Sequence, residues 1–218
     1  MANTELNCLI GIVGYSPVLD AYPLGPQLML GLERRFAGLE GIAIENMTWG
    51  PIHIVQHFQD DDGPRPARLI LIGGSSDSAS PGAVTAYKWG GGKLPAALLQ
   101  ERVYEAVTGI VDIDNTLAIG EHFGIWPAEV YVVEVDLPMN CFGDMVIADR
   151  DGRKADVALS ALIGFSPATS IARVVDMVAS LADGGREGEV FALKVATPLA
   201  RGASFTRHRI VHPEGPMS

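Results

Sequence analysis

The sequence predicts a single three-layer α/β domain in which helices flank both faces of a mostly parallel central sheet. Short apolar runs alternate along the chain with amphipathic helical patterns, which is the element order of α/β proteins. The runs at 8–13 and 69–72 are apolar almost throughout, as expected for strands covered on both faces. With 218 residues, 48% of them apolar, the chain is long enough to bury one core of this kind.

Five strands are expected from apolar runs bounded by turn signals, over residues 8–13, 42–45, 69–72, 84–89 and 130–136. Helices are expected between them where apolar residues recur every three or four positions. Their predicted spans are 27–36, 51–58, 95–107 and 166–182.

Each helix has an apolar stripe that predicts its buried face. In the first helix Leu28, Leu32 and Phe36 share one stripe. In the third, the stripe consists of Leu98, Leu99, Val103 and Val107. The last helix begins at Ser166 with Pro167 in its first turn and ends before Asp183 and two glycines. Its stripe consists of Ile171, Val174, Val175, Val178 and Leu181.

The domain is expected to span residues 1–197. The turn sequence DRDG predicts an inserted loop or hairpin over 138–165, and a further strand is expected at 190–195. Residues 198–218 are rich in Arg, His, Pro and Gly and predict a flexible tail.

Charge and composition exclude several classes of function. Sixteen basic and twenty-six acidic residues give a net charge of −10, which argues against nucleic acid or an anionic membrane as a partner. We expect no membrane insertion and a cytoplasmic location, because no apolar run approaches the roughly 20 residues that span a bilayer. Cys8 and Cys141 are too few for a disulfide framework and are expected to be buried thiols.

Four stretches, in order along residues 8–182, suggest a relative. They are GYSPVLDAYPLG at 14–25, ENMTWG at 45–50, LILIGGSSDSASPGAV at 69–84 and GFSP at 164–167. Their order resembles that of the hydrogenase maturation proteases, endopeptidases that trim the C-terminus of a nickel–iron hydrogenase large subunit. The resemblance implies the maturation-protease fold. It also places a candidate catalytic acid at Asp20 and substrate-binding positions at Glu45, Thr48 and Gly50.

The same resemblance implies three nickel ligands, and this sequence departs from that pattern. The first position falls on Asp20, Ala21 or Tyr22, the second on Gly73, which has no side chain, and the third near Gly109. Nickel needs converging nitrogen and carboxylate donors. We therefore expect no metal cofactor of the family type, and the residues of any metal site stay unknown.

These departures lead to one functional hypothesis and two alternatives. The first is a non-cleaving, peptidase-like protein of nickel–iron hydrogenase assembly, which binds the large subunit or a maturation factor as its protein partner. The second is an active divergent endopeptidase with relocated ligands, such as Asp20 with His53 or His122. The third is a structural subunit of an unrelated complex. Whether the chain is an enzyme stays open at this stage.

Simpler structural roles compete with the functional ones. Asp20 is also a typical turn residue, and the Thr48 hydroxyl is suited to capping the following helix. His53 and His57 share a helix face, but Ile54 stands where a metalloprotease helix needs glutamate, so half-exposed histidines are expected.

Two further clusters have simple explanations. Glu121 and His122, preceded by Asp112 and Asp114, are expected at a solvated helix end, and the run 60–62 in a hydrated loop. The glycines at 90–92 between Lys88 and Lys93 lack the ending of a phosphate-binding loop and predict a flexible connection.

Overall fold

The computed structural model describes residues 6–13, 25–75, 81–92, 94–107, 113–137 and 166–184, with short stretches at 198–199, 203–204 and 207–210. Its elements in chain order are β1 (Cys8–Ile12), α1 (Gly25–Arg35), β2 (Ile42–Asn46), α2 (Pro51–Gln59), β3 (Arg68–Ser75), β4 (Val84–Trp89), α3 (Ala96–Val107), α4 (Ile113–Phe123), β5 (Glu129–Asp136), α7 (Pro167–Ala182), β6 (Pro198–Leu199), β7 (Ala203–Ser204) and β8 (Arg207–Ile210). All five predicted strands are present.

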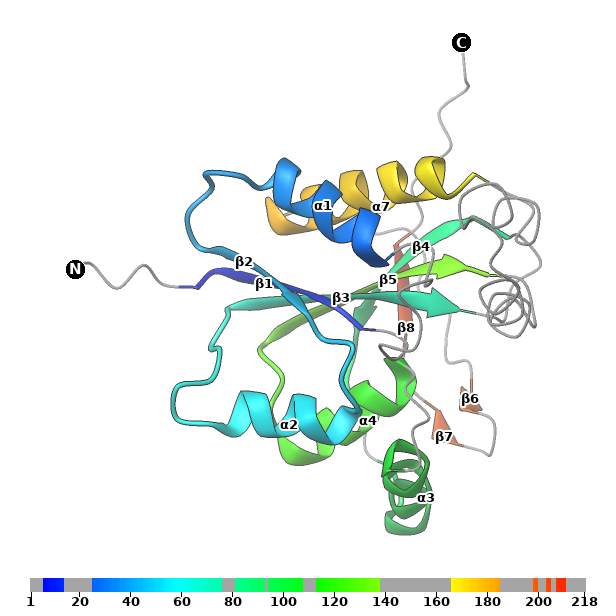
Figure 1. Ribbon diagram of the computed structural model, residues 1–218. Helices are drawn as coiled ribbons and strands as arrows, with labels where there is room; N and C mark the ends of the chain where they lie inside the picture. Colours follow the sequence, from blue (N-terminus) through cyan, green and yellow to red (C-terminus); the bar gives the residue numbers. More distant parts are fainter. Residues whose placement is uncertain are drawn as a thin grey trace, which may run out of the picture.

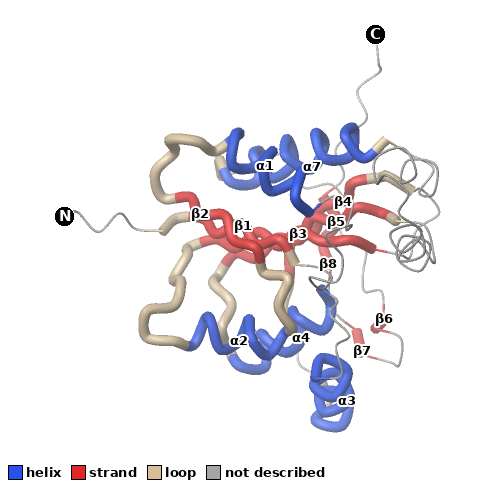
Figure 2. The backbone as a smooth tube through the Cα atoms, in the orientation of Figure 1, coloured by secondary structure: helices blue, strands red, loops and turns tan. Residues whose placement is uncertain are grey.

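The central sheet is mixed but mostly parallel. Its strand order is β2-β1-β3-β5-β4-β8, and the first four of these strands run in the same direction. β4 is antiparallel to both of its neighbours, β5 and β8. α1 and α7 cover one face, while α2 and α4 cover the other (Figure 1). Figure 2 shows the sheet as one twisted layer between these two helix layers, which confirms the predicted α/β fold.

The apolar runs of β1 and β3 are buried on both faces, as predicted. Ile10 and Ile70 belong to the core under α1 and α7, whereas Leu9 and Leu69 belong to the core over α2 and α4. All four side chains are fully buried. Each such burial contributes roughly 1.5–3 kcal/mol to folding, so a polar residue at any of these four positions would lower the stability of the fold.

The helix stripes are confirmed for α1 and, in large part, for α7. Leu28, Leu32 and Phe36 are all buried against the sheet. In α7, Val174 and Val178 are buried, and Ser166 is the N-cap residue with Pro167 following it. Because α1 and α7 also contact one another, they form a continuous layer over this face.

The stripe predicted for α3 is wrong at its last position. Val107 is 71% exposed, and Ala106 is the buried residue of this helix. The reason is that α3 packs on α4 and α2 and lies outside the helix layer, as Figure 1 shows. A helix in that position buries only a narrow strip.

Two elements differ from the sequence prediction. α4, at Ile113–Phe123, was not among the predicted helices. Residues 198–218 were expected to form a flexible tail, but Arg207–Ile210 form β8, the edge strand beside β4. Backbone hydrogen bonding to an open strand edge does not require an apolar sequence, so a polar segment can supply this strand.

Several predictions fall on residues outside the described ranges. They include the loop with Asp20, the hairpin at 138–165, Cys141 and the strand at 190–195. Within the ranges that are described, no helix is both long enough and apolar enough to cross a membrane.

Candidate functional site

Three of the four predicted site residues, Glu45, Thr48 and Gly50, lie at the carboxyl end of β2, and the fourth, Asp20, lies outside the described residues. The four parallel strands begin in register, with Cys8 opposite Ile42 and Arg68, so their carboxyl ends also meet at one edge of the sheet. This edge lies on the right of Figure 1, and in α/β proteins ligands bind outside it. Glu45 lies on β2, and Thr48 and Gly50 follow it before α2 begins.

Glu45 and His57 form the polar centre of this region. His57 Nε2 donates to Glu45 Oε2 at 2.9 Å, and this contact joins β2 to the second turn of α2. Both side chains are half-buried, at 31% and 30% exposure. Solvent therefore screens the pair, and it contributes well under 1 kcal/mol to stability. Its main effect is to hold the two side chains in one orientation.

Trp49 packs beside this pair and remains open to solvent. Its ring meets the His57 imidazole edge to face at a centroid distance of 5.1 Å. His57 in turn meets Phe58 in the same manner, at 5.9 Å. Trp49 is 37% exposed, although an indole usually gains from full burial. We call Glu45, Thr48, Trp49, Gly50 and His57 the β2–α2 shoulder.

The cap of α2 differs from the simple role considered for Thr48. The N-cap residue is Gly50, which makes no side-chain cap bond, and Pro51 opens the helix. The Gly50 carbonyl accepts from His53 N at 2.9 Å. The Thr48 backbone N–H is satisfied by Asn46 Oδ1 at 3.1 Å. Pro51 needs no hydrogen-bond acceptor, so the helix starts without help from a hydroxyl.

The shoulder combines several kinds of side-chain chemistry. It offers a carboxylate, an imidazole, a threonine and an exposed indole, a combination that can both hydrogen bond and bury apolar surface. Glu45 and His57 point at one another, and two side-chain donors are fewer than a nickel site requires. Among the residues that the structure describes, no group of three or more His, Cys, Asp or Glu side chains is placed to hold a metal ion.

The second nickel position implied by the resemblance does not fit a metal. A Cβ atom on Gly73 would lie 2.6 Å from Ile113 Cδ1 and 3.0 Å from Val13 O. Ile113 is the first residue of α4 and is only 5% exposed. The space beside Gly73 is thus occupied by an aliphatic side chain from the other side of the core.

Several other histidines and acids within the described ranges lie at the surface. His53 and His122 are exposed on their helices, and the acids at 60–62 lie exposed after α2. Glu121 is more engaged than expected, because Trp89 Nε1 donates to its Oε2 at 2.8 Å.

The glycine run at 90–92 lies against that same carboxylate. Gly91 has φ +73°, and a Cβ on it would lie 3.3 Å from Glu121 Oε1. A carboxylate at this distance would repel a phosphate, so the arrangement favours the interpretation of these glycines as a connection.

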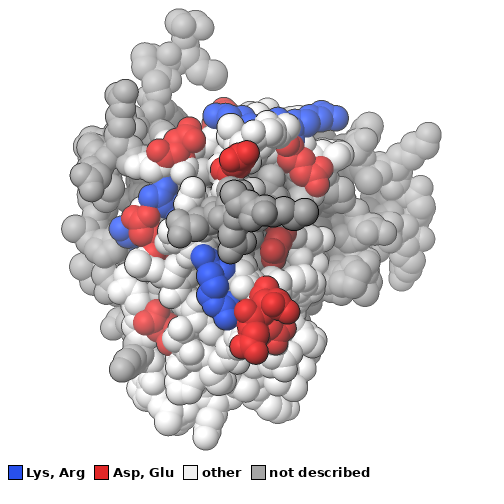
Figure 3. All heavy atoms as spheres, turned by 90° about the vertical axis from the view of Figure 1, so that its left-hand side faces the viewer, with Lys and Arg blue, Asp and Glu red and all other residues white. Residues whose placement is uncertain are grey.

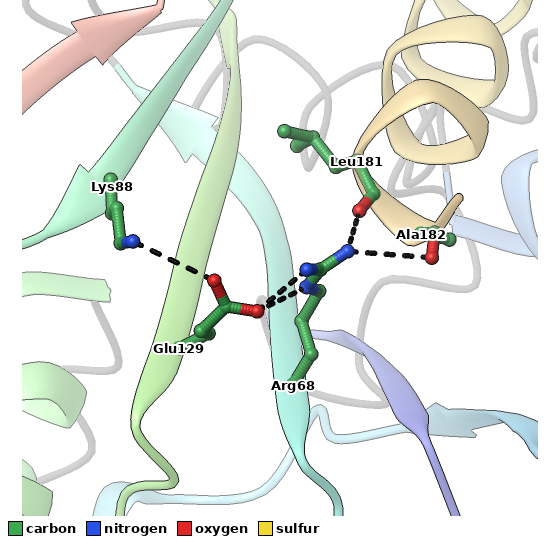
Figure 4. A network of polar contacts seen from close by, with 5 residues as sticks. All are labelled: Arg68, Lys88, Glu129, Leu181 and Ala182. Atoms are coloured by element: carbon green, nitrogen blue, oxygen red, sulfur yellow. Dashed lines mark hydrogen bonds and ion pairs between the residues drawn. The ribbon is translucent and has the colours of Figure 1, made fainter. Parts of the chain in front are cut away.

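Sequence reasoning missed a polar network at the opposite, amino edge of the sheet (Figure 4). Arg68, the first residue of β3, donates through Nε and Nη2 to Glu129 Oε2 at 2.9 and 2.6 Å. Its Nη1 donates to the carbonyls of Leu181 and Ala182 in the last turn of α7. The hydrogen bonds from Arg68 hold the pKa of Glu129 below its usual value, with its attraction to Arg68 and Lys88 adding to the effect.

This network borders a hollow of about 360 Å³. The hollow lies at the amino ends of the strands, and Cys8, Ile42 and Gly184 are among the residues that line it. Burial raises the pKa of the Cys8 thiol to about 11, so the thiol is neutral and unreactive at pH 7. Figure 3 looks onto this face, where acidic side chains gather in several groups with basic ones between them. Arg68 already donates four hydrogen bonds, to Glu129 and to the last turn of α7, so its role is to connect these elements.

No protein-family model matches the sequence, and no curated protein matches it either. A solved structure to which the chain is similar is the hydrogenase 2 maturation peptidase from Thaumarchaeota archaeon SCGC_AB-539-E09. The match covers 80% of this chain and 97% of that chain, with 13% sequence identity and a TM-score of 0.42.

Proposed function

We propose that this protein acts in the assembly or maturation of a nickel–iron hydrogenase, by binding the large subunit or a maturation factor without cleaving it. The proposal rests on the motif order described above and on the geometry of the β2–α2 shoulder. The shoulder occupies the place where the resemblance has its recognition signature.

The observation that carries the proposal is Trp49. Its indole is held by the His57 ring and yet is 37% exposed, while Glu45 keeps His57 in place. Aromatic residues that are held rigidly and left open are typical centres of protein interfaces. They lose little conformational freedom on binding and bury a large area.

Binding without cleavage is physically consistent with this site. Recognition needs a complementary surface with satisfied polar groups, whereas catalysis needs groups that stabilise the transition state more than the substrate. The shoulder supplies the former. Position 73 supplies no side-chain ligand, because glycine has no side chain, and Ile113 fills the space beside it.

The test is binding of the purified chain to a nickel–iron hydrogenase large-subunit precursor by calorimetry. We expect Trp49→Ala to weaken binding about tenfold, which corresponds to ~1.4 kcal/mol. The matched control is Leu39→Ala, because Leu39 is 47% exposed but lies in the connection before β2 at the opposite edge. Equal affinities of the two variants would contradict the proposal.

The mass of the precursor after incubation separates the alternatives. An intact precursor that remains bound agrees with recognition alone. A precursor shortened at its C-terminus would establish the divergent endopeptidase instead. If neither the precursor nor a maturation factor binds, a structural role in an unrelated complex becomes the better hypothesis.

A further inference from the structure

The sheet has a notch near its carboxyl edge, on the face that α2 and α4 cover. Gly11 on β1 and Gly73 on β3 both belong to this face, and neither fills the space above its strand. A Cβ on Gly11 would lie 2.5 Å from Met47 Sδ, just as one on Gly73 would lie 2.6 Å from Ile113 Cδ1. Side chains from other elements therefore occupy the space that the two glycines leave.

Ile113 is the side chain that enters the notch at Gly73. It begins α4 and packs in the same apolar cluster as Val13, Leu71 and Leu117. Beside Gly73 the nearest side-chain atoms are aliphatic carbons of Ile113, and the nearest oxygen is the backbone carbonyl of Val13, whereas nickel needs converging nitrogen and carboxylate donors. The register partner of Gly73 on β5 is Glu134, and the alternation of the strand places the buried carboxylates of both Glu134 and Asp136 on this face. Among the residues that the structure describes, they belong to no group of three or more His, Cys, Asp or Glu side chains that could hold a metal ion.

We propose that the Ile113 side chain takes the place of a metal centre at this edge and that its contact with Gly73 fixes the start of α4 against the sheet. The fold family implies a metal ion here, and the residues of this chain do not fit one. This inference concerns packing and metal chemistry alone. It stands or falls independently of the hydrogenase partner.

A double-mutant cycle in thermal unfolding tests the contact. Gly73→Ala places a methyl group against Ile113, and we expect the Tm to fall by about 5 °C through overpacking. Ile113→Ala empties the notch and should also lower the Tm. In the double variant the new methyl group enters the space that Ile113 has left, so the loss should be clearly smaller than the sum of the two single losses. Additive losses would overturn the proposal.

Nickel titration of the wild type, Gly73→Ala and Glu134→Gln tests the metal chemistry. We expect no saturable binding that depends on either position. The proposal predicts either no nickel binding or equal binding by all three proteins. Equal binding would arise from surface histidines such as His53. Saturable binding that disappears in Gly73→Ala or in Glu134→Gln, with the fold intact by circular dichroism, would overturn it.

Discussion

Replacing Arg68 by methionine should loosen the amino edge of the sheet. Methionine keeps an aliphatic stem of similar reach and removes every N–H donor of the guanidinium. Glu129 would then keep only Lys88, whose Nζ lies 3.7 Å from Glu129 Oε1. The last carbonyls of α7 would lose the donor that now caps them.

The expected loss follows from the exposure of each contact. A buried hydrogen bond to a charged group contributes roughly 1.5–3 kcal/mol. The Glu129 side chain is 36% exposed, so solvent screens the ion pair, and we count it as about 1 kcal/mol. The contact with the carboxyl end of α7 adds about 1 kcal/mol. The total of about 2 kcal/mol corresponds to a Tm lower by about 6 °C for a chain of this length.

Urea unfolding followed by circular dichroism at pH 7 measures this loss. The matched control is Arg173→Met, because Arg173 is exposed in the middle of α7, away from its carboxyl end, and its replacement should leave the midpoint unchanged. If Arg68→Met lies within about 0.5 kcal/mol of the wild type, our account of the network is wrong. A loss of equal size in the control would also count against it.

Three further predictions follow from the structure. First, the folded-state pKa of Glu129 lies below its ordinary value of 4.5, so its contribution to folding stability is present above pH 4.5 and is lost as the pH falls through the folded pKa. The difference in unfolding free energy between the wild type and Arg68→Met, measured by urea titration, should therefore narrow from pH 5 to pH 3. Second, burial raises the pKa of Cys8 from 9.0 to about 11, so the contribution of the neutral thiol to folding stability is complete below pH 9 and is lost as the pH rises toward 11. Over this range the wild type should lose stability relative to Cys8→Ala. With the second cysteine replaced by serine, Cys8 should also resist a thiol reagent at pH 8 until the chain unfolds, and rapid native reaction would contradict its burial. Third, a double-mutant cycle on Glu45 and His57 should give a coupling of about 0.5 kcal/mol that declines with added salt, whereas a coupling above about 2 kcal/mol would mean that the pair is far less solvated than its exposure indicates.

The helix that the sequence did not reveal shows the limit of periodicity. α4 reads IDNTLAIGEHF, in which Asp114, Asn115, Thr116 and Gly120 are poor helix formers. Yet Asn115 and Thr116 are buried, at 0% and 1% exposure. Tertiary packing therefore stabilises this helix against its local preference, and the sequence indicated only its end, near Glu121 and His122.

The site was predictable only in part, for a related reason. Glu45, Thr48 and Gly50 are neighbours in sequence, and they lie close together at the end of β2 for that reason. His57 lies twelve positions from Glu45, and its contact depends on how α2 packs against the edge of the sheet. No sequence pattern singles out Trp49, because the exposure of an indole ring is decided by the tertiary structure.

By itself the sequence determined the order of elements and the two-sided burial of the strands, because apolar periodicity is a local property and the hydrophobic effect favours burial of each apolar side chain wherever it lies in the fold. The tertiary structure alone decided which distant residues meet. Arg68 and Glu129 are 61 positions apart and pair because β3 and β5 begin in register. Ile113 reaches Gly73 because a glycine leaves room that only a neighbouring helix can fill. Such contacts depend on register and packing, which act between segments and leave no pattern within either one.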